Sequence, residues 1–361
     1  MINAVQTDGA TRFPKKLLKA GNDIAKVIPL VHLTYVSVND QGIERRKAGK
    51  HFNYYYKDKK ITDKKTLERI KKLVLPPAWQ QVWICRQSNG HIQATGIDAR
   101  GRKQYRYHAL WSELREHSKF YRMIAFSKVL PLIRETVQQH LRQHGVNREK
   151  VLAAIVSLME QTSIRIGNSF YEQLYGSFGL STLRNKHVQL TAATIHFVFK
   201  GKKGVYQDIS LRDRKLATVI RACKEIPGKE LFQYRDEDGT IHAVDSGMVN
   251  QYIRDISNGD FSSKDFRTWN GSVNFIKAFL KAAAETEGAI SIPGLLDEVA
   301  RHLGNTRNVC KKHYVHPLLL QMAEDKVLEK HCSGCGTEIP GLLKEENILV
   351  HVLGKGWREK Q

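Results

Sequence analysis

A tyrosine near the C-terminus, Tyr314, follows a short stretch that contains three basic residues, Arg307, Lys311 and Lys312. A phenol is a weak nucleophile at neutral pH because its pKa is near 10. A reactive tyrosine therefore needs cations that stabilise its anion and the charge developing on the electrophile. The spacing allows a tyrosine nucleophile among positive charges, but it also fits a surface aromatic among lysines. Motifs elsewhere in the chain are needed to distinguish a nucleophile from a surface tyrosine.

Two helices are expected to position this tyrosine. Apolar residues recur at helical spacing from Leu295 to Leu303, and Gly304 is a typical residue for ending such a helix. Thr306 is a suitable N-cap for a second helix that would carry Tyr314. The N-terminal dipole of this second helix would point toward an anion.

The net charge indicates a polyanionic partner. The 361 residues contain 58 lysines and arginines against 36 acidic residues, a formal charge of +22, and the basic residues are spread along the whole chain. Solubility or association with ribosomes is the alternative explanation, but this charge exceeds what solubility needs. We therefore expect DNA or RNA as the partner.

Cysteine usage and hydropathy indicate the compartment. The odd number of cysteines, five, does not suggest the disulfide framework of a secreted protein. No apolar run approaches the length of a membrane span, and the first 30 residues do not resemble a signal sequence. We expect a cytoplasmic protein without a membrane partner.

The first third of the chain predicts a β-sheet domain over residues 31–112, after a basic extension over residues 1–30. Strands are expected at 33–38 and 52–56, and a helix begins at Asp63 and stops before Pro76. A hairpin is expected around Ser88-Asn89-Gly90, with strands at 82–85 and 91–95.

The next strand, over residues 101–108, carries side chains suited to nucleic acid. Alternation places Gln104 and Arg106 on one face and Tyr105 and Tyr107 on the other. Glutamine and arginine can bind base edges, and tyrosines can donate to phosphate or stack on sugars and bases. The alternative is an ordinary amphipathic strand whose tyrosines pack inward.

The remaining residues, 113–361, predict a larger and mostly helical domain with a small β-hairpin. Helices are expected at 118–130, from Pro131 to residue 144, after the N-cap Asn147, and at 211–223 and 249–256. Strands at 194–200 and 205–209 form the hairpin, with lysines at its tip. Ser262-Ser263 begins a helix whose apolar stripe excludes Arg267. The fold class is therefore α+β.

These segments together resemble the type IB DNA topoisomerases, in particular their small poxvirus-like bacterial branch. The resemblance spans residues 30–330. It rests on the Gly-Arg-Lys-Gln-Tyr strand, Arg165-Ile166-Gly167, the segment Leu183 to His187, the Phe-Lys-Gly-Lys hairpin, Lys-Asp-Phe-Arg-Thr and the terminal Lys-Lys-His-Tyr. It implies a catalytic domain that is similar to that of tyrosine recombinases.

The resemblance implies a role for each matched residue. Arg165 and Arg267 would bind the scissile phosphate, Lys202 would protonate the leaving oxygen, and Tyr314 would attack phosphorus. Asn305 stands where eukaryotic and poxviral members have histidine, and an amide can still donate to a non-bridging oxygen, without charge. In the N-terminal domain, Gln104, Tyr105 and Tyr107 match positions that meet DNA, with Arg102 and Lys103 beside them in the same strand.

The implied activity is relaxation of supercoiled duplex DNA by transient cleavage of one strand, rotation and religation. A 3′-phosphotyrosyl bond conserves the energy of the cleaved bond, so the resemblance implies that no ATP is needed. It also implies no other cofactor and no required metal, although divalent cations can stimulate. The chain also lacks a phosphate-binding loop. The implied protein is a monomer that clamps DNA in the bacterial nucleoid.

Two other functions use similar residues. A tyrosine recombinase-like strand transferase shares the arginine, lysine, arginine and tyrosine set, but the N-terminal sheet argues against it. A non-catalytic duplex DNA-binding protein would need only the charge and the aromatic strand. Cys332 and Cys335 have the spacing of half a zinc ribbon or of a redox pair, but no second such pair exists, and we expect a structural or incidental role.

Overall fold

The computed structural model describes residues 28, 32–49, 51–99, 101–285, 290–334 and 338–358, without the side chains of residues 113–119, 121 and 355–358. The chain divides into two compact units, Met1–Ser118 (unit 1) and Lys119–Gln361 (unit 2). The division falls inside the long helix α4 (Ala109–Leu141), as does the expected boundary between residues 112 and 113. Except for Ile28, the expected extension 1–30 lies outside the described residues.

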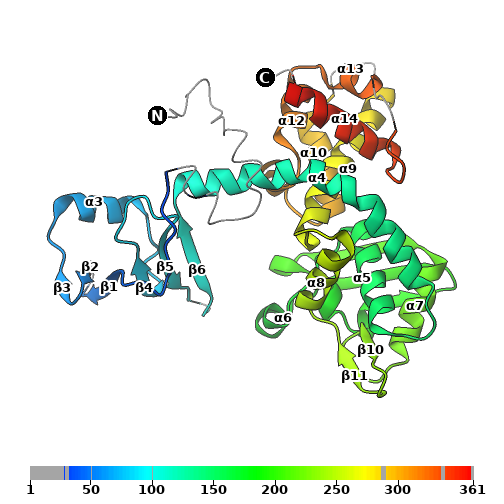
Figure 1. Ribbon diagram of the computed structural model, residues 1–361, viewed down its shortest axis with the longest axis horizontal. Helices are drawn as coiled ribbons and strands as arrows, with labels where there is room; N and C mark the ends of the chain where they lie inside the picture. The colour runs from blue at the N-terminus through cyan, green and yellow to red at the C-terminus, as the bar shows by residue number, and fades with distance from the viewer. Residues whose placement is uncertain are drawn as a thin grey trace. The chain divides into compact units, whose positions relative to one another are not determined.

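Unit 1 is an antiparallel six-stranded sheet with one helix on a face (Figure 1). The strand order is β3 (Lys59–Lys60), β2 (His51–Tyr56), β1 (Ile43–Ala48), β4 (Gln80–Ile84), β5 (Ile92–Ile97) and β6 (Lys103–Tyr107). Helix α3 (Lys64–Lys72) is capped by Asp63, as predicted, and packs Ile70 against Ile43 and Ile84. The strand order places β6 at an edge of the sheet, where Lys103, Tyr105 and Arg106 are exposed and Gln104 and Tyr107 are partly exposed.

One predicted strand in unit 1 was wrong. Residues 33–38 form no strand, and only Thr34 makes an isolated bridge, to Gly90. Leu33 and Val36 are both buried but lie three residues apart, whereas side chains on one face of a strand are an even number of residues apart. The two residues are therefore buried separately and do not form one strand face. The next strand along the chain, β1, was not predicted because its run of charged residues does not resemble a strand pattern.

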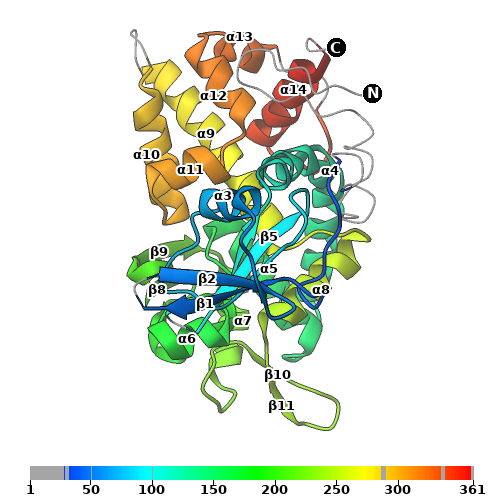
Figure 2. The same ribbon diagram turned by 90° about the vertical axis from the view of Figure 1, so that its left-hand side faces the viewer.

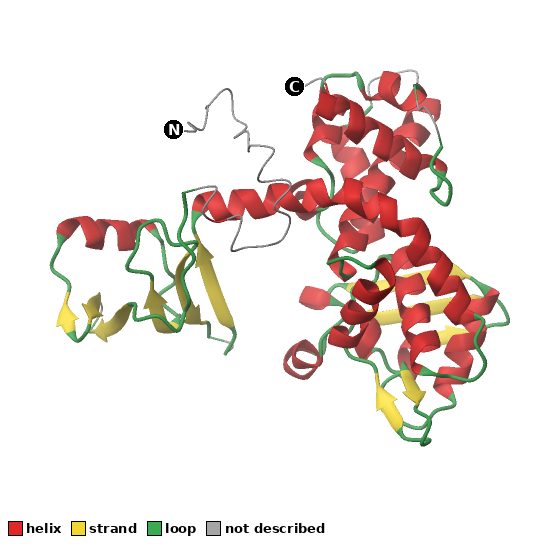
Figure 3. Cartoon of the chain, viewed as in Figure 1, coloured by secondary structure: helices red, strands yellow, loops and turns green. Residues whose placement is uncertain are grey.

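Unit 2 is mostly helical and contains two small sheets (Figure 3). One sheet has the order β7 (Val188–Leu190), β8 (Thr194–Lys200), β9 (Tyr206–Arg212), and the other pairs β10 (Gln233–Arg235) with β11 (Ile241–Ala243). Besides the end of α4, the helices are α5 (Arg148–Thr162), α6 (Ser169–Tyr175), α7 (Arg214–Lys224), α8 (Ser246–Ser257), α9 (Ser263–Glu285), α10 (Ile292–Leu303), α11 (Arg307–His313), α12 (Pro317–Glu324), α13 (Leu328–Ser333) and α14 (Lys344–Arg358). The α+β class predicted from the sequence is confirmed.

Two buried helices organise the core of unit 2. Residues 151–159 of α5 are all buried, and α9 buries Phe266, Trp269 and Phe275. Helices α9 to α14 gather together in two perpendicular views, and α5 lies with the sheet β7–β9 (Figure 2). None of the helices in the described part of the chain is both long and apolar enough to cross a membrane.

Helix α4 contradicts the predicted break at Pro131. Residues 109–141 form one helix with Pro131 inside it, although an internal proline removes a hydrogen bond and costs about 3 kcal/mol. The buried residues Phe126 and Leu130 before the proline and Ile133 and Val137 after it belong to one stripe in the same core. Burial of this continuous stripe outweighs the local cost.

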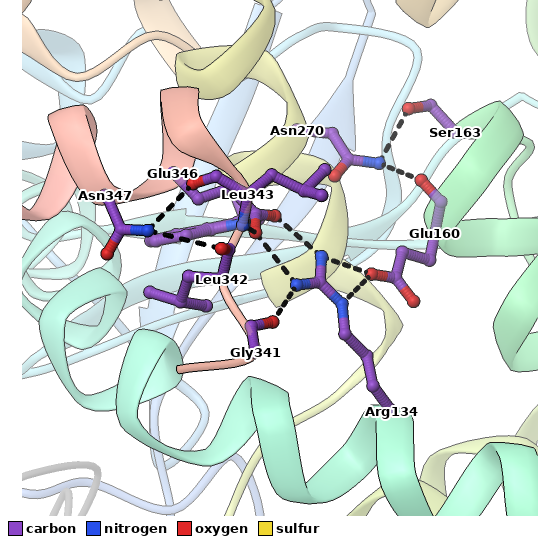
Figure 4. Close-up of polar contacts among 10 residues, drawn as sticks. Arg134, Glu160, Ser163, Asn270, Gly341, Leu342, Leu343, Glu346 and Asn347 are labelled. Carbon is purple, nitrogen blue, oxygen red and sulfur yellow. Dashed lines mark hydrogen bonds and ion pairs between the residues drawn. The ribbon is translucent and has the colours of Figure 1, made fainter. Parts of the chain in front are cut away.

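A partly buried ion network connects the last helix to the core of unit 2 (Figure 4). Arg134 of α4 donates to Glu160 of α5 at 2.6 Å and to both carboxylate oxygens of Glu346 in α14 at 2.7 and 2.9 Å. Glu346 also accepts from the indole N–H of Trp269 at 2.9 Å. Burial opposes ionisation of Glu346, but the hydrogen bonds and charge of Arg134 outweigh it and lower its pKa.

Candidate active site

The five predicted catalytic residues come from five different segments of unit 2. Arg165 follows α5, and Lys202 lies in the turn between β8 and β9. Arg267 is in the first part of α9, Asn305 lies between α10 and α11, and Tyr314 ends α11. Residues that are far apart in sequence are therefore brought to one place only by tertiary packing.

Arg267 lies against the ring of Tyr314, with its guanidinium carbon 5.1 Å from the ring centroid. It is only 6% exposed and donates to the main-chain oxygen of Ser163 and, at 2.9 Å, to that of Leu303. Its Nε is buried without a hydrogen-bond partner. A buried cation with an unused donor is suited to bind an anion next to the phenol.

Arg165 and Asn305 form a second pair. The guanidinium of Arg165 donates to Oδ1 of Asn305 at 2.5 Å. This bond leaves Nδ2 as the free end of the Asn305 amide, and Nδ2 is buried without a partner. The pair therefore fixes which end of the amide can donate to a bound group, and both side chains can offer N–H groups to the same anion.

Lys202 is exposed at the tip of the β8–β9 hairpin, in a short 3₁₀ turn over Lys202–Gly204. Partial removal of its ammonium group from water and the charge of Arg165 lower its pKa, while Tyr314 raises it. The net direction is downward. A lysine whose pKa moves toward neutrality is a better proton donor in catalysis than an ordinary lysine.

The phenol of Tyr314 is activated by its surroundings. Burial disfavours its anion, but the charges of Arg267, Arg165 and Lys202 outweigh this and lower its pKa. The adjacent thiol of Cys310 is buried, which raises its pKa to about 11. The thiol is therefore neutral at physiological pH, and Tyr314 is the better candidate for a nucleophile.

The predicted helix ends beside Tyr314 are confirmed, but the cations expected there were wrong in part. Gly304 ends α10 in the left-handed region (φ 57°) and Thr306 caps α11, as predicted. Tyr314 is the C-cap of α11, so the anion expected at the N-terminal end of this helix is not the phenol and stays a prediction. The cations that act on Tyr314 are those of distant segments, and Arg307 instead bonds Asp297 at 2.7 Å.

Sequence reasoning missed four residues that support these catalytic candidates. Asn270 donates through Nδ2 to the main-chain oxygen of Glu160 at 2.7 Å and to Oγ of Ser163 at 2.9 Å (Figure 4). Ser163 has a left-handed backbone (φ 57°) and lies two residues before Arg165. Gly271 and Ser272 contact the main chain of Tyr314. The sequence signal for three of them was a run of small or polar residues, 270–272, between two members of the apolar stripe of α9, Trp269 and Val273.

The predicted DNA-binding residues lie together on β6 or just before it in unit 1. Tyr105 and Tyr107 stack with ring centroids 5.9 Å apart, and the ammonium of Lys103 lies 5.9 Å from the Tyr105 ring. Arg102 and Gln104 both donate to Asp98, at 2.7 and 2.9 Å. The strand thus presents two aromatic rings beside a cation, while Asp98 orients Arg102 and Gln104.

Three of the five cysteines are free thiols. Cys85, Cys223 and Cys310 are free and buried, Cys332 is buried, and Cys335 lies outside the described residues. Among the residues whose side chains the structure describes, no three histidines, cysteines or acidic residues gather as a metal site would require. The structural or incidental role expected for Cys332 and Cys335 stays a prediction.

Two family models match the chain. The eukaryotic DNA topoisomerase I catalytic core matches residues 108–333, and the bacterial DNA topoisomerase IB N-terminal domain matches residues 51–98. The first match contains the five catalytic candidates, and the second covers most of the sheet of unit 1.

Curated relatives carry corresponding names. The chain is 34% identical to DNA topoisomerase 1B of Acanthamoeba polyphaga mimivirus over 79% of this chain and 88% of that protein. It is 21% identical to DNA topoisomerase 1B of vaccinia virus, over 69% and 77% of the two chains. Among solved structures, the XerH site-specific recombinase bound to difH substrate matches 60% of this chain and 66% of that chain, with a TM-score of 0.34 and 12% identity.

Proposed function

The chain belongs to the type IB DNA topoisomerase family and is a DNA topoisomerase, and we propose that Tyr314 is the nucleophile with which it cleaves one DNA strand. The observation that carries this proposal is the position of the Tyr314 ring against Arg267. The charges of Arg267, Arg165 and Lys202 lower the pKa of the Tyr314 phenol. A tyrosine placed in this way can form a phenolate and attack a phosphodiester.

In the proposed step, the phenol oxygen of Tyr314 bonds to the scissile phosphorus and the bond from phosphorus to the 5′-oxygen breaks. The phenol proton is lost to water. Lys202 donates a proton to the departing 5′-oxygen, which would otherwise leave as a strongly basic alkoxide. The product is a 3′-phosphotyrosyl bond and a free 5′-hydroxyl. The reverse attack reseals the strand after rotation, so no ATP is needed.

Arg165, Arg267 and Asn305 would stabilise the charge that develops on the non-bridging oxygens. Nε of Arg267 and Nδ2 of Asn305 have no partner, so a phosphate oxygen would complete their hydrogen bonding. Donors already held in place by Ser163, Leu303 and Arg165 need little reorganisation during the reaction. Two guanidinium groups thereby do the work that a metal ion does in other phosphoryl-transfer sites.

The substrate that fits these features is supercoiled duplex DNA. The net charge of +22 favours a polyanion, and Lys103, Tyr105 and Tyr107 on β6 offer a cation and stacked rings for the backbone and bases. We place the protein on bacterial chromosomal DNA in the cytoplasm, acting as a monomer.

Relaxation of a supercoiled plasmid in EDTA and without ATP tests this function. The wild-type chain is expected to relax the plasmid, and Tyr314→Phe is expected to bind it without relaxing it. Activity that EDTA abolishes and added Mg²⁺ or Zn²⁺ restores would contradict the proposed metal-free site.

A further inference from the structure

We propose that Ser272, together with Gly271, is a positioning residue that holds the main chain of Tyr314 and thereby places its phenol beside Arg267. The proposal rests on the function proposed above for Tyr314, and it adds a residue that touches neither the phosphate nor the phenol. It is carried by two independent contacts between consecutive residues of α9 and the end of α11.

The first contact is a hydrogen-bonded bridge through the Ser272 hydroxyl. Oγ of Ser272 donates to the main-chain oxygen of Tyr314 at 3.2 Å and accepts from the main-chain N–H of His316 at 3.0 Å. Ser272 is fully buried, so water does not replace these bonds when the hydroxyl is absent. The bridge spans the junction between α11, which ends at His313, and α12, which begins at Pro317, where the helical hydrogen-bond pattern is interrupted.

The second contact is the close approach of Tyr314 to Gly271. A Cβ added at Gly271 would lie 2.7 Å from both Cβ and the main-chain oxygen of Tyr314, closer than real side chains come. Alanine forms helices better than glycine does, so glycine here is locally unfavourable for α9. The main-chain atoms of Tyr314 thus occupy the space that a side chain would fill.

The same helix carries Arg267, five residues before Ser272, so α9 holds both the cation and the nucleophile. Its geometry sets the separation between the phenol and the guanidinium. The other groups that face Tyr314 are the cations Arg165 and Lys202, from outside α9, and the Cys310 thiol of α11, which is neutral near pH 7. Loosening the main chain of Tyr314 moves its phenol relative to all of them.

A buried hydroxyl on a helix can also serve stability alone, and Thr268 of the same helix provides that comparison. Thr268 is 7% exposed, and its Oγ1 donates to the main-chain oxygen of Lys264 at 3.2 Å. The removal of this hydroxyl also costs a buried hydrogen bond in α9. Thr268→Val is therefore a matched control for Ser272→Ala.

The test is single-turnover cleavage by the full chain at saturating enzyme, across pH, on duplex DNA with sulfur at the 5′-bridging position. Sulfur leaves as a stable thiolate and needs no proton from Lys202, so the rising limb of the profile reports on the phenol. We expect Ser272→Ala and Gly271→Ala to retain DNA affinity and to cleave about 10- to 100-fold more slowly near neutral pH, since a misplacement of 1 Å can cost that much.

The pH profile separates positioning from stability. Displacement from its cations raises the pKa of Tyr314, so the rising limb of both variants should move to higher pH and the deficit should shrink there. Thr268→Val should keep the wild-type limb. The proposal is overturned if Ser272→Ala behaves like Thr268→Val, or if Gly271→Ala, which keeps every hydrogen bond of Ser272, cleaves like wild type. If Tyr314→Phe still cleaves DNA, the proposed function itself fails.

Discussion

The bond between Arg165 and Asn305 predicts that the two residues do not act independently. Asn305→Ala removes a donor to the charged phosphate, and it also removes the oxygen that holds the Arg165 guanidinium at 2.5 Å. Both are hydrogen bonds to charged groups, which contribute about 1.5–3 kcal/mol each, so we expect Asn305→Ala to raise the cleavage barrier by about 3–6 kcal/mol in total.

A double-mutant cycle isolates the shared part. If Asn305 acts partly through Arg165, the variant lacking both side chains should lose less than the sum of the two single losses. The discrepancy should be about 1.5–3 kcal/mol, or about 10- to 150-fold in rate. The assay is single-turnover cleavage of a duplex oligonucleotide by wild type, Arg165→Ala, Asn305→Ala and the double variant.

The pair of Asn305 with Arg267 is the internal control for this cycle. Arg267 is held by the main-chain oxygens of Ser163 and Leu303, and no bond joins it to Asn305 among the described contacts. The Arg267→Ala and Asn305→Ala losses should therefore be closer to additive. If the Arg165 and Asn305 losses add to within about 0.5 kcal/mol, the inferred support of Arg165 by Asn305 is refuted.

Three further predictions concern acid catalysis, stability and DNA affinity. Lys202→Ala should cleave ordinary DNA about 10²–10⁴-fold more slowly but recover on a 5′-bridging phosphorothiolate, whereas Arg267→Ala should not recover; rescue of both or neither would make Lys203 or Lys200 the next candidate acid. Glu346→Ala should cost about 3–5 kcal/mol in urea unfolding because it leaves Arg134 partly unpaired, whereas Glu345→Ala should cost about 0.5 kcal/mol or less. Because the pKa of Glu346 is lowered in the folded state, this contribution is complete above its unfolded pKa and is lost as the pH falls through the folded pKa; an unchanged acid limb in Glu346→Ala would contradict it. Affinity for duplex DNA should fall steeply with salt, and a flat plot of log affinity against log salt would refute extensive phosphate contact.

The sequence allowed the local framework of the site to be predicted. Gly304, Thr306 and Asn147 act as helix caps because their side chains or their freedom at positive φ satisfy helix ends, whatever the rest of the fold does. The β8–β9 hairpin was likewise expected from alternating apolar residues around a glycine-rich turn. These features depend on neighbours within a few residues.

Errors arose where distant contacts outweigh local preference. Pro131 looked like a helix start, but burial on both sides of it keeps α4 continuous. Tyr314 was expected within a helix near Lys311 and Lys312, yet its pKa is set by Arg267, Arg165 and Lys202, which come from other segments. No local pattern reveals which cation will face a phenol.

The supporting residues of α9 were hidden for a related reason. Asn270 and Ser272 are polar residues that a helical pattern assigns to solvent, but both are buried against main-chain atoms of the catalytic segments. Gly271 reads as a weak point of a helix, and its meaning appears only when Tyr314 lies against it. Their roles depend on which chain segment packs there.

The most direct test of the mechanism is to trap and map the covalent adduct. The wild-type chain would be incubated in EDTA with a duplex whose short 5′-hydroxyl fragment diffuses away after cleavage, and the trapped adduct would be digested and sequenced by mass spectrometry. The proposed mechanism predicts one DNA strand joined through its 3′-phosphate to Tyr314, and no adduct from Tyr314→Phe. An adduct on another residue, a linkage to the 5′-phosphate, or an adduct that persists in Tyr314→Phe would contradict it.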